Sequence, residues 1–315
     1  AYRAYLMGRY HLNLFGARGF AKAREHFEEA VDVDPEWAPA YAGLSLAYSF
    51  LSGWKALPPE SMETARQHAV VALGLDDSLS EAHVAMGTVK GQWDWDWQAA
   101  EYHGKRAIEL EPNSSIAHSS YAIFMAGLRR PDEAVAHGRR ALDLDPFNPT
   151  VKNNYSVALA RAQLHDEALA QLHEALEMVP ENAAVLMSLF RNHLVNERYD
   201  DALAMLERHD SAWLERVGKL GEFKEVCAHR GWRAAVEWRS RQAELSGAPD
   251  ERWTYRAALF YCLAGPCDRA MPLLERAYTS RNPQLFWVFS EPAFDPIRSD
   301  PRFQDLLRRM NFPVD

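Results

Sequence analysis

The chain has 315 residues, of which 48% are hydrophobic, so it can bury a large core and does not have the composition of a disordered protein. Lys and Arg total 35 against 44 Asp and Glu, and this net charge of -9 argues against a surface that neutralises nucleic-acid phosphates. No apolar run approaches the roughly 18 residues that a membrane span needs, and the opening AYRAYLMGRYHLN has no signal-peptide core.

The chain begins at Ala1 without an initiator methionine and already inside a predicted helix. We therefore expect a piece of a longer protein, in which an effector domain or an anchor could precede Ala1. The composition favours a cytoplasmic location.

One frame of alanines and a closing proline recurs between Ala23 and Pro180. Two alanines stand seven positions apart with a large or small residue between them, and a proline follows. The frame occurs at Ala23, Phe27, Ala30 and Pro35; at Ala100, Gly104, Ala107 and Pro112; at Ala134, Gly138, Ala141 and Pro146; and at Ala168, Leu172, Ala175 and Pro180. Successive steps from Pro112 to Pro146 and Pro180 are 34 residues. A fixed period of this size indicates a solenoid of helix pairs.

Each repeat is predicted to hold a helix A, which follows the proline, and a helix B, which carries the alanines. The inward face of helix A is marked by Tyr41, Leu44, Ser45 and Tyr48, since these spacings fall on one side of a helix. Proline ends helix B because it cannot continue a helix. A polar residue after the proline, Asn113 or Ser114 in one repeat and Asn148 in another, is predicted to cap the next helix A.

Two places depart from the period before the pattern fades. An insertion near 51–60 contains Gly53, Pro58 and Pro59 and predicts a longer connection between helices A and B. The run Trp93–Trp97 alternates tryptophan with aspartate, so some rings are expected to fill the groove between repeats. Asp94 or Asp96 is predicted to cap the helix B that follows.

Three regions are predicted from these patterns. Residues 1–210 form about six regular repeats, residues 211–280 form divergent helical repeats, and residues 281–315 form a cap. The last apolar residues, Phe303, Leu306, Leu307 and Met310, share one helical face. We expect this helix to cover the final apolar surface, as a solenoid requires.

The Ala, large-or-small, Ala, Pro pattern resembles the tetratricopeptide repeat over about 23–206, and again at Ala270, Leu274 and Ala277. The resemblance implies an all-α, right-handed solenoid of helix-turn-helix repeats with a C-terminal cap. It further implies a non-enzymatic module that binds a protein or peptide in the concave groove lined by the A helices.

A closer resemblance rests on YLMGRYHLN, FEEAVDVDPEWAPAYAGLSLAY, the tryptophan run and FDPIRSDPRFQDLLRRM. These stretches are similar to C-terminal repeat modules of bacterial signalling proteins. In such proteins the module follows a cyclase domain, a Ser/Thr kinase domain or a winged-helix DNA-binding domain. The resemblance implies a regulatory sensor attached to an effector, although none of the kinase motifs occurs in this chain.

Histidines recur at one helix-B position in four repeats, His26, His68, His103 and His137. Packed helix axes lie about 8–10 Å apart, whereas zinc ligands lie about 2 Å from the ion. Successive B helices therefore cannot converge on one ion, and we predict no metal site. No nucleophile–base, Walker, Rossmann or H-E-x-x-H pattern occurs, so we expect neither catalysis nor a cofactor.

The chain has three cysteines, Cys227, Cys262 and Cys267, whose spacing fits no common zinc site. Buried or half-buried free thiols in a reducing compartment are the favoured interpretation. A disulfide between Cys262 and Cys267 is the alternative.

The concave positions of three A helices supply the predicted partner-binding residues, which are Ser119, Ser120, Asn153, Asn154, Met187 and Arg191. The two asparagines are able to bond a peptide backbone, or they satisfy helix ends and water. Chaperone-binding members of the family hold a C-terminal carboxylate with lysines, asparagines and an arginine. Only Asn154 matches that set here, so we do not expect such a clamp.

Three other modes of binding remain open. The basic stretch Arg230–Arg241 is a candidate for an acidic partner or a solvated helix face. A small-molecule pocket lined by Trp93, Trp95 or Trp253 is the alternative sensing function. Nucleic-acid binding is disfavoured by the acidic balance, and an N-terminal edge that could pair with a neighbour leaves oligomerisation open.

Overall fold

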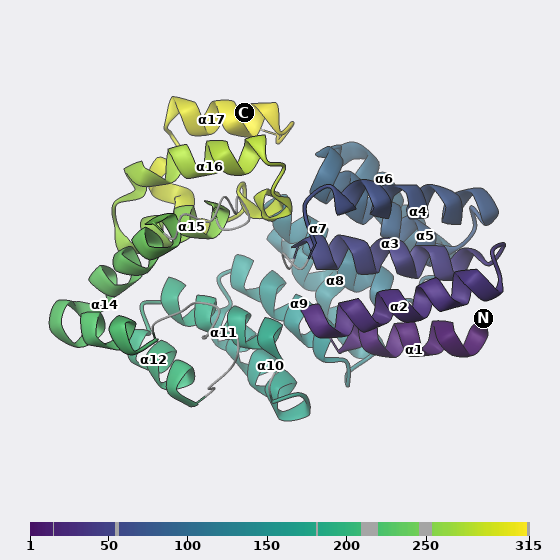
Figure 1. The fold of residues 1–315 in the computed structure, drawn as a ribbon, viewed down its shortest axis with the longest axis horizontal. Helices are drawn as coiled ribbons and strands as arrows, with labels where there is room; N and C mark the ends of the chain where they lie inside the picture. Colours follow the sequence, from purple (N-terminus) through teal and green to yellow (C-terminus); the bar gives the residue numbers. More distant parts are fainter. Residues whose placement is uncertain (15, 54–56, 181, 209–219, 246–253, 314–315) are drawn as a thin grey trace. The chain divides into compact units, whose positions relative to one another are not determined.

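The computed structural model describes residues 1–14, 16–53, 57–180, 182–208, 220–245 and 254–313, and within these ranges every regular element is a helix. The α-helices run in chain order as follows (Figure 1): α1 Tyr2–Asn13, α2 Ala17–Val33, α3 Ala38–Gly53, α4 Ser61–Leu75, α5 Ser80–Val89, α6 Trp97–Leu110, α7 Ser115–Gly127, α8 Pro131–Leu144, α9 Pro149–Arg161, α10 His165–Met178, α11 Ala183–Val195, α12 Tyr199–Arg208, α14 Leu220–Leu245, α15 Thr254–Ala264, α16 Ala270–Thr279 and α17 Pro301–Arg309.

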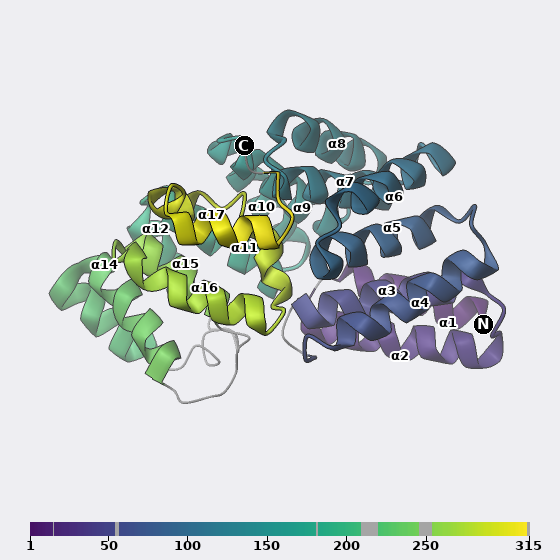
Figure 2. The same cartoon turned by 90° about the horizontal axis from the view of Figure 1, so that it is seen from above.

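The chain forms two compact units, unit 1 (Ala1–Ser188) and unit 2 (Leu189–Asp315). In unit 1 the A helices α1, α3, α5, α7 and α9 alternate with the B helices α2, α4, α6, α8 and α10, and Figure 2 shows α1 to α8 stacked in chain order. The predicted all-α solenoid of helix pairs is therefore confirmed.

The recurring alanines lie at the contact between helices A and B. Ala23, Ala30, Ala107, Ala141 and Ala168 are all 0% exposed. A methyl group is small enough to let two helix backbones approach closely, so these positions set the distance between the helices of each repeat.

The size of the residue between the alanines is complementary to the size of the residue that faces it on a neighbouring A helix. Where helix B carries Gly104 or Gly138, the next helix A places Tyr121 or Tyr155 there, and a Cβ on either glycine would lie 2.6 Å from that ring. Where helix B carries Phe27 instead, the neighbouring A helices carry glycine. Large and small residues are thus complementary across the contact, which explains why both occur at this position of the frame.

The predicted helix caps are confirmed at Ser114 and Asn148, whereas the Asn113 side chain accepts from Arg140 and does not cap α7. The Ser114 hydroxyl accepts a hydrogen bond from the Ala117 N–H, and the Asn148 carboxamide oxygen accepts from the Thr150 and Val151 N–H groups at 2.9 and 3.3 Å. These bonds satisfy backbone donors that the first turn of a helix leaves unpaired.

The tryptophan run forms an irregular connection between α5 and α6. Lys90–Asp94 is π-helical, Trp95 has a left-handed backbone (φ 53°), and Trp95 and Trp97 are buried. Asp96 caps α6 by accepting from the Ala99 N–H at 3.1 Å. Asp94 instead forms ion pairs with Arg66 and Lys90.

The predicted regional boundaries stay predictions. Around the insertion, α3 ends at Gly53 and α4 begins at Ser61, and residues 54–56 lie outside the described ranges. The predicted boundary at 210–211 also falls outside them.

In unit 2, Cys262 and Cys267 are joined in a disulfide, so the prediction of free thiols at these positions is wrong. Cys262 lies in the last turn of α15, and Gly265 then adopts φ 119° before Pro266. This reversal brings two residues five positions apart to a Cα–Cα distance of 4.1 Å. Cys227 is a free thiol, and burial raises its pKa to about 11.

The C-terminal segment forms the predicted cap of unit 2. After two short 3₁₀ helices, Pro283–Trp287 and Pro292–Ile297, helix α17 buries its apolar face fully, since Phe303, Leu306 and Leu307 are 0% exposed. The cap is confirmed as an amphipathic helix that follows an irregular, proline-containing segment.

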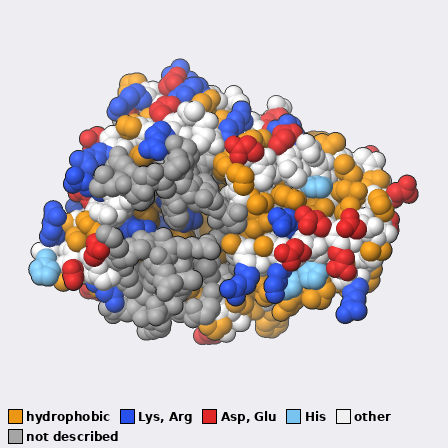
Figure 3. All heavy atoms as spheres, in the orientation of Figure 1, with side chains coloured by type: hydrophobic (Ala, Val, Ile, Leu, Met, Phe, Trp, Pro, Cys, Tyr) orange, Lys and Arg blue, Asp and Glu red, His pale blue; other side chains and the backbone are white. Residues whose placement is uncertain are grey.

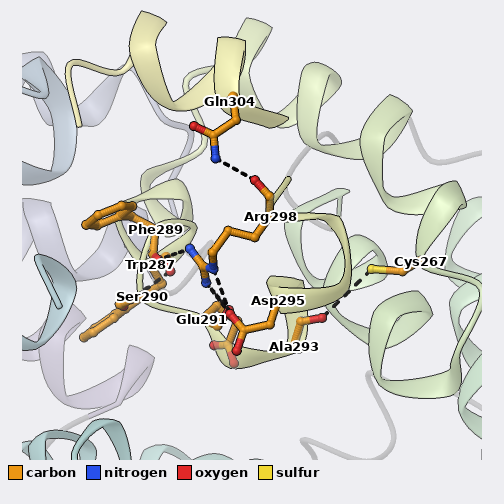
Figure 4. A network of polar contacts seen from close by, with 9 residues as sticks. All are labelled: Cys267, Trp287, Phe289, Ser290, Glu291, Ala293, Asp295, Arg298 and Gln304. Atoms are coloured by element: carbon orange, nitrogen blue, oxygen red, sulfur yellow. Dashed lines mark hydrogen bonds and ion pairs between the residues drawn. The ribbon is translucent and has the colours of Figure 1, made fainter. Parts of the chain in front are cut away.

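Arg298 holds this irregular segment together (Figure 4). Its guanidinium donates to the Phe289 carbonyl at 2.9 Å and to the Asp295 carboxylate at 2.6 and 2.8 Å. The Gln304 amide in turn donates to the Arg298 carbonyl at 2.5 Å. The rigid fork of donors thus joins the second 3₁₀ helix to the turn that precedes it, and the backbone of Arg298 links this segment to α17.

Ala107→Leu is expected to lower the free energy of unfolding by about 1–3 kcal/mol, because the larger side chain overpacks the contact between α6 and its neighbours. Urea denaturation followed by circular dichroism measures the loss. Glu109→Leu is the matched control, since Glu109 is exposed on the same helix and its substitution should change stability little. Equal losses in both variants would contradict the close-contact role of Ala107.

Arg298→Lys is expected to destabilise the cap by about 1–3 kcal/mol, because one ammonium cannot replace the bonds to both Phe289 and Asp295. Hydrogen–deuterium exchange of peptides covering 289–304 measures local opening. Arg302→Lys serves as the control, because Arg302 is 63% exposed and its ion pair with Asp300 is a surface pair. Unchanged exchange in Arg298→Lys would contradict the role of this network.

Candidate functional site

Four of the six predicted partner-binding residues come from two neighbouring A helices. Ser119 and Ser120 lie on α7, and Asn153 and Asn154 lie on α9. The Asn154 amide donates to the Ser119 hydroxyl at 3.0 Å, so the structure joins two residues that are 35 positions apart in the sequence. We call Ser119, Ser120, Asn153 and Asn154 the α7–α9 polar cluster.

The members of this cluster differ in access to solvent. Ser120 and Asn154 are half-buried, whereas Ser119 and Asn153 are each only 4% exposed. Ser120 and Asn154 are therefore the accessible members, and the buried Ser119 hydroxyl holds the Asn154 amide in place.

Asn153 has an unpaired acceptor. Its carboxamide oxygen is buried and finds no hydrogen-bond partner among the described residues. A buried unpaired acceptor costs about 1–3 kcal/mol.

The remaining two predicted residues lie at the division between the units. Met187 is half-buried on α11 in unit 1. Arg191 belongs to unit 2, where its guanidinium lies 3.6 Å from the carboxylate of the fully buried Glu291. Arg191 therefore has a role inside unit 2 that the sequence did not indicate.

The net negative charge of the protein comes from unit 1. Residues 1–188 contain 16 Lys and Arg against 25 Asp and Glu, whereas residues 189–315 contain 19 of each. On the side of unit 1 seen at the right of Figure 3, acidic and basic side chains are interspersed among apolar ones. The α7–α9 polar cluster itself carries no charge, so its chemistry is that of neutral hydrogen bonds.

Contacts between distant repeats bring the first helix pair against later ones. The Tyr5 hydroxyl donates to Glu81 at 2.7 Å, and Arg9 forms an ion pair with the same carboxylate at 2.7 Å. Burial and the Glu81 charge raise the pKa of Tyr5. These residues were missed because no sequence pattern relates α1 to α5.

The turn after α1 lies beside the α9 end of the solenoid. The Thr150 hydroxyl donates to the Asn13 carbonyl, and the Asn182 amide donates to the Leu14 carbonyl, both at 3.1 Å. The first repeat therefore contacts the beginnings of α9 and α11, and unit 1 curves far enough to bring its ends together.

The recurring helix-B histidines are paired with residues of helix A. His103 Nδ1 lies 2.9 Å from His83 Nδ1, and His137 Nδ1 lies 2.8 Å from His118 Nδ1. We call these two contacts the histidine bridges. The sequence analysis noted only the half-buried helix-B members, because the pairing partner lies on the other helix of the same repeat.

Metal binding is not indicated by this geometry. Each bridge offers two nitrogens, and within the described residues no group of three or more His, Cys, Asp or Glu side chains gathers as metal ligands. Equivalent histidines of successive repeats pair within their own repeat.

A tetratricopeptide-repeat family model matches residues 159–212. Among solved structures, the human IFIT1 dimer with m7Gppp-AAAA is 14% identical, with a TM-score of 0.57 over 84% of this chain and 68% of that chain. The human IFIT1 dimer with PPP-AAAA is 16% identical, with a TM-score of 0.55 over 84% and 69%. TTC0263, a tetratricopeptide-repeat protein of Thermus thermophilus, is 18% identical over 59% and 96%, with a TM-score of 0.47. No curated protein sequence matches the chain.

The helix pairs of the structure, the family-model match and the similarity to the IFIT1 structures confirm the tetratricopeptide-type solenoid, and they show the fold alone. The closer resemblance to modules of bacterial signalling proteins stays a prediction. Among the helices that the structure describes, none is long and apolar enough to cross a bilayer.

Asn153→Ala is expected to lower the free energy of unfolding by less than Asn148→Ala does. The first change removes an unpaired acceptor, whereas the second removes the cap of α9 and costs about 1 kcal/mol. Thermal and urea denaturation of both variants measure the difference. A loss in Asn153→Ala as large as that in Asn148→Ala would show that Asn153 is a structural residue.

Proposed function

We propose that this chain is a non-enzymatic protein-interaction module, which binds an extended peptide or protein segment along the α7–α9 polar cluster. The observation that carries the proposal is the set of neutral hydrogen-bonding groups on neighbouring A helices. Asn154, held by Ser119, presents a carboxamide that can pair with the backbone of an extended segment.

The chemistry of the cluster also defines the kind of segment. Ile123 lies one turn further along α7, is half-buried and adds apolar surface beside the polar groups, whereas Val157, one turn further along α9, is buried. A ligand that presents backbone amides and aliphatic side chains fits this surface. An acidic C-terminus does not, because the positions that would hold a carboxylate carry no lysine or arginine.

We further propose that the module regulates a larger bacterial signalling or transcription-regulating protein. The support is the resemblance of the opening YLMGRYHLN and the closing FDPIRSDPRFQDLLRRM to such modules. In this setting, binding at the α7–α9 polar cluster would report the presence of the partner to an attached cyclase, kinase or DNA-binding domain.

The small-molecule alternative has no specific support. Trp95 is buried, Trp93 packs partly against Met62 and Val89, and Trp253 lies outside the described residues. RNA is the ligand of the IFIT1 complexes named above. Unit 1 of this chain is acidic and the α7–α9 polar cluster is uncharged, so neither feature supports RNA binding by this chain.

Selection of short random peptides displayed on phage against the full chain tests the proposal. Enriched peptides are expected to bind the double variant Asn154→Ala/Ser120→Ala about tenfold more weakly, since two hydrogen-bonding groups are lost, each worth about 0.5–1.5 kcal/mol. Fluorescence anisotropy of labelled peptides gives the affinities, and circular dichroism confirms that the variant is folded.

Gln98→Ala is the matched control, because Gln98 is an exposed amide on α6, a B helix. Its affinity should equal that of the parent chain. Peptides that bind the double variant and the parent equally well would place the binding surface elsewhere and overturn the proposal.

A further inference from the structure

The two histidine bridges share one hydrogen-bonding arrangement. In repeat 3, the second nitrogen of His83, Nε2, lies 3.0 Å from the Asp77 carbonyl oxygen. In repeat 4, Nε2 of His118 lies 3.1 Å from the Pro112 carbonyl oxygen. In both repeats the carbonyl belongs to the turn that precedes helix A.

These contacts determine the tautomer of each neutral ring. A carbonyl oxygen only accepts, so Nε2 of His83 and of His118 carries the proton, and Nδ1 of each is an acceptor. The facing Nδ1 of His103 and of His137 must therefore carry a proton and donate it. Each bridge is a directed hydrogen bond from helix B to helix A.

A bridge tolerates one added proton but not two. The first proton binds Nε2 of the helix-B histidine and leaves the bond between the two Nδ1 atoms in place. A second proton can bind only Nδ1 of the helix-A histidine. Two N–H groups and two positive charges would then face each other across less than 3 Å, and the rings must separate.

The surroundings of the bridges also disfavour protonation. Burial, the His83 ring and Lys90 lower the pKa of His103 to about 4, against the opposing charge of Asp96. Burial lowers the pKa of His118, with Arg140 adding to the effect and the Pro112 carbonyl opposing it. Burial and His118 lower that of His137, which faces Glu133 and the Tyr121 ring.

The direction of the pH effect follows from these shifts. An unfolded histidine binds a proton near pH 6.5, whereas the bridged ring of His103 does so only near pH 4. Between these values the unfolded or opened state binds more protons. The stability of the bridged state is therefore complete above about pH 6.5 and falls as the pH falls toward 4.

The bridge of repeat 4 is attached directly to the α7–α9 polar cluster, since His118 is followed by Ser119 and Ser120 on α7. We propose that the histidine bridges are proton-operated latches, and that their opening in acid moves α7 relative to α8 and releases the segment bound at the cluster. The latch itself is a property of the fold, and its effect on binding rests on the proposed function.

The neighbouring repeat provides a natural contrast. Lys152 stands on α9 where His118 stands on α7, and its ammonium pairs with Glu174 of α10 at 2.5 Å. This link in repeat 5 contains no imidazole. Acid that weakens the histidine links of repeats 3 and 4 should therefore move α7 relative to α9.

Nitrogen NMR of the imidazole rings in the full chain tests the latch without any ligand. At about pH 7.5, His103 and His137 should be in the Nδ1–H form and His83 and His118 in the Nε2–H form. The helix-B rings should titrate well below pH 6.5, the ordinary value for histidine. Nε2–H forms of His103 and His137, or titration of these rings near pH 6.5, would overturn the latch.

Hydrogen–deuterium exchange of α7 and peptide affinity, each at about pH 7.5 and about pH 5, test its effect. In the parent chain, exchange of α7 should increase and peptide affinity should fall about tenfold in acid, because the opened state binds more protons than the bridged state. The double variant His103→Asn/His137→Asn keeps an N–H donor near the Nδ1 position but cannot titrate. It should lose most of the acid response, while the control His173→Asn should retain it.

The outcomes separate the two proposals. If the rings show the expected tautomers and α7 opens in acid but no selected peptide binds the cluster, the proposed function fails and the latch stands. If peptides bind the cluster with equal affinity at both pH values, the control of binding by the latch is refuted and the proposed function stands.

Discussion

Close approach of helix A to helix B is the constraint on which the rest of unit 1 depends. It is set by buried alanines and by the complementary sizes of glycine on one helix and tyrosine on the other. Because interiors are packed as densely as organic crystals, a side chain that crosses this contact must match its opposite in size and hydrogen bonding. Helices held in this way present their other faces in a fixed register.

The same constraint explains the polar links inside the repeats. The position taken by His83 and His118 on helix A faces the outer part of helix B at hydrogen-bonding distance. Histidine on both helices forms a neutral bond there, whereas Lys152 forms an ion pair with Glu174. Repeats with one backbone geometry thus carry links of different chemistry.

The sequence was a good guide to the local structure of the candidate site but a poor guide to its contacts. Placing Asn153 and Asn154 on helix A required only the period of the repeat. That Asn154 is held by Ser119 while Asn153 is buried could not be read from the sequence, because each depends on how α9 packs against α7. For Arg191, the partner is Glu291, 100 residues away, which no local pattern reveals.

By itself the sequence determined the helix pairs, their alanine contacts, the caps at Ser114 and Asn148 and the amphipathic last helix. Each of these depends on residues within a few helical turns, where spacing and side-chain type decide the outcome. Only the tertiary structure decided the histidine bridges, the Cys262–Cys267 disulfide and the contact of the first repeat with α9. These depend on distances across helices and turns, which change by several ångströms with small differences in helix packing that periodicity does not encode.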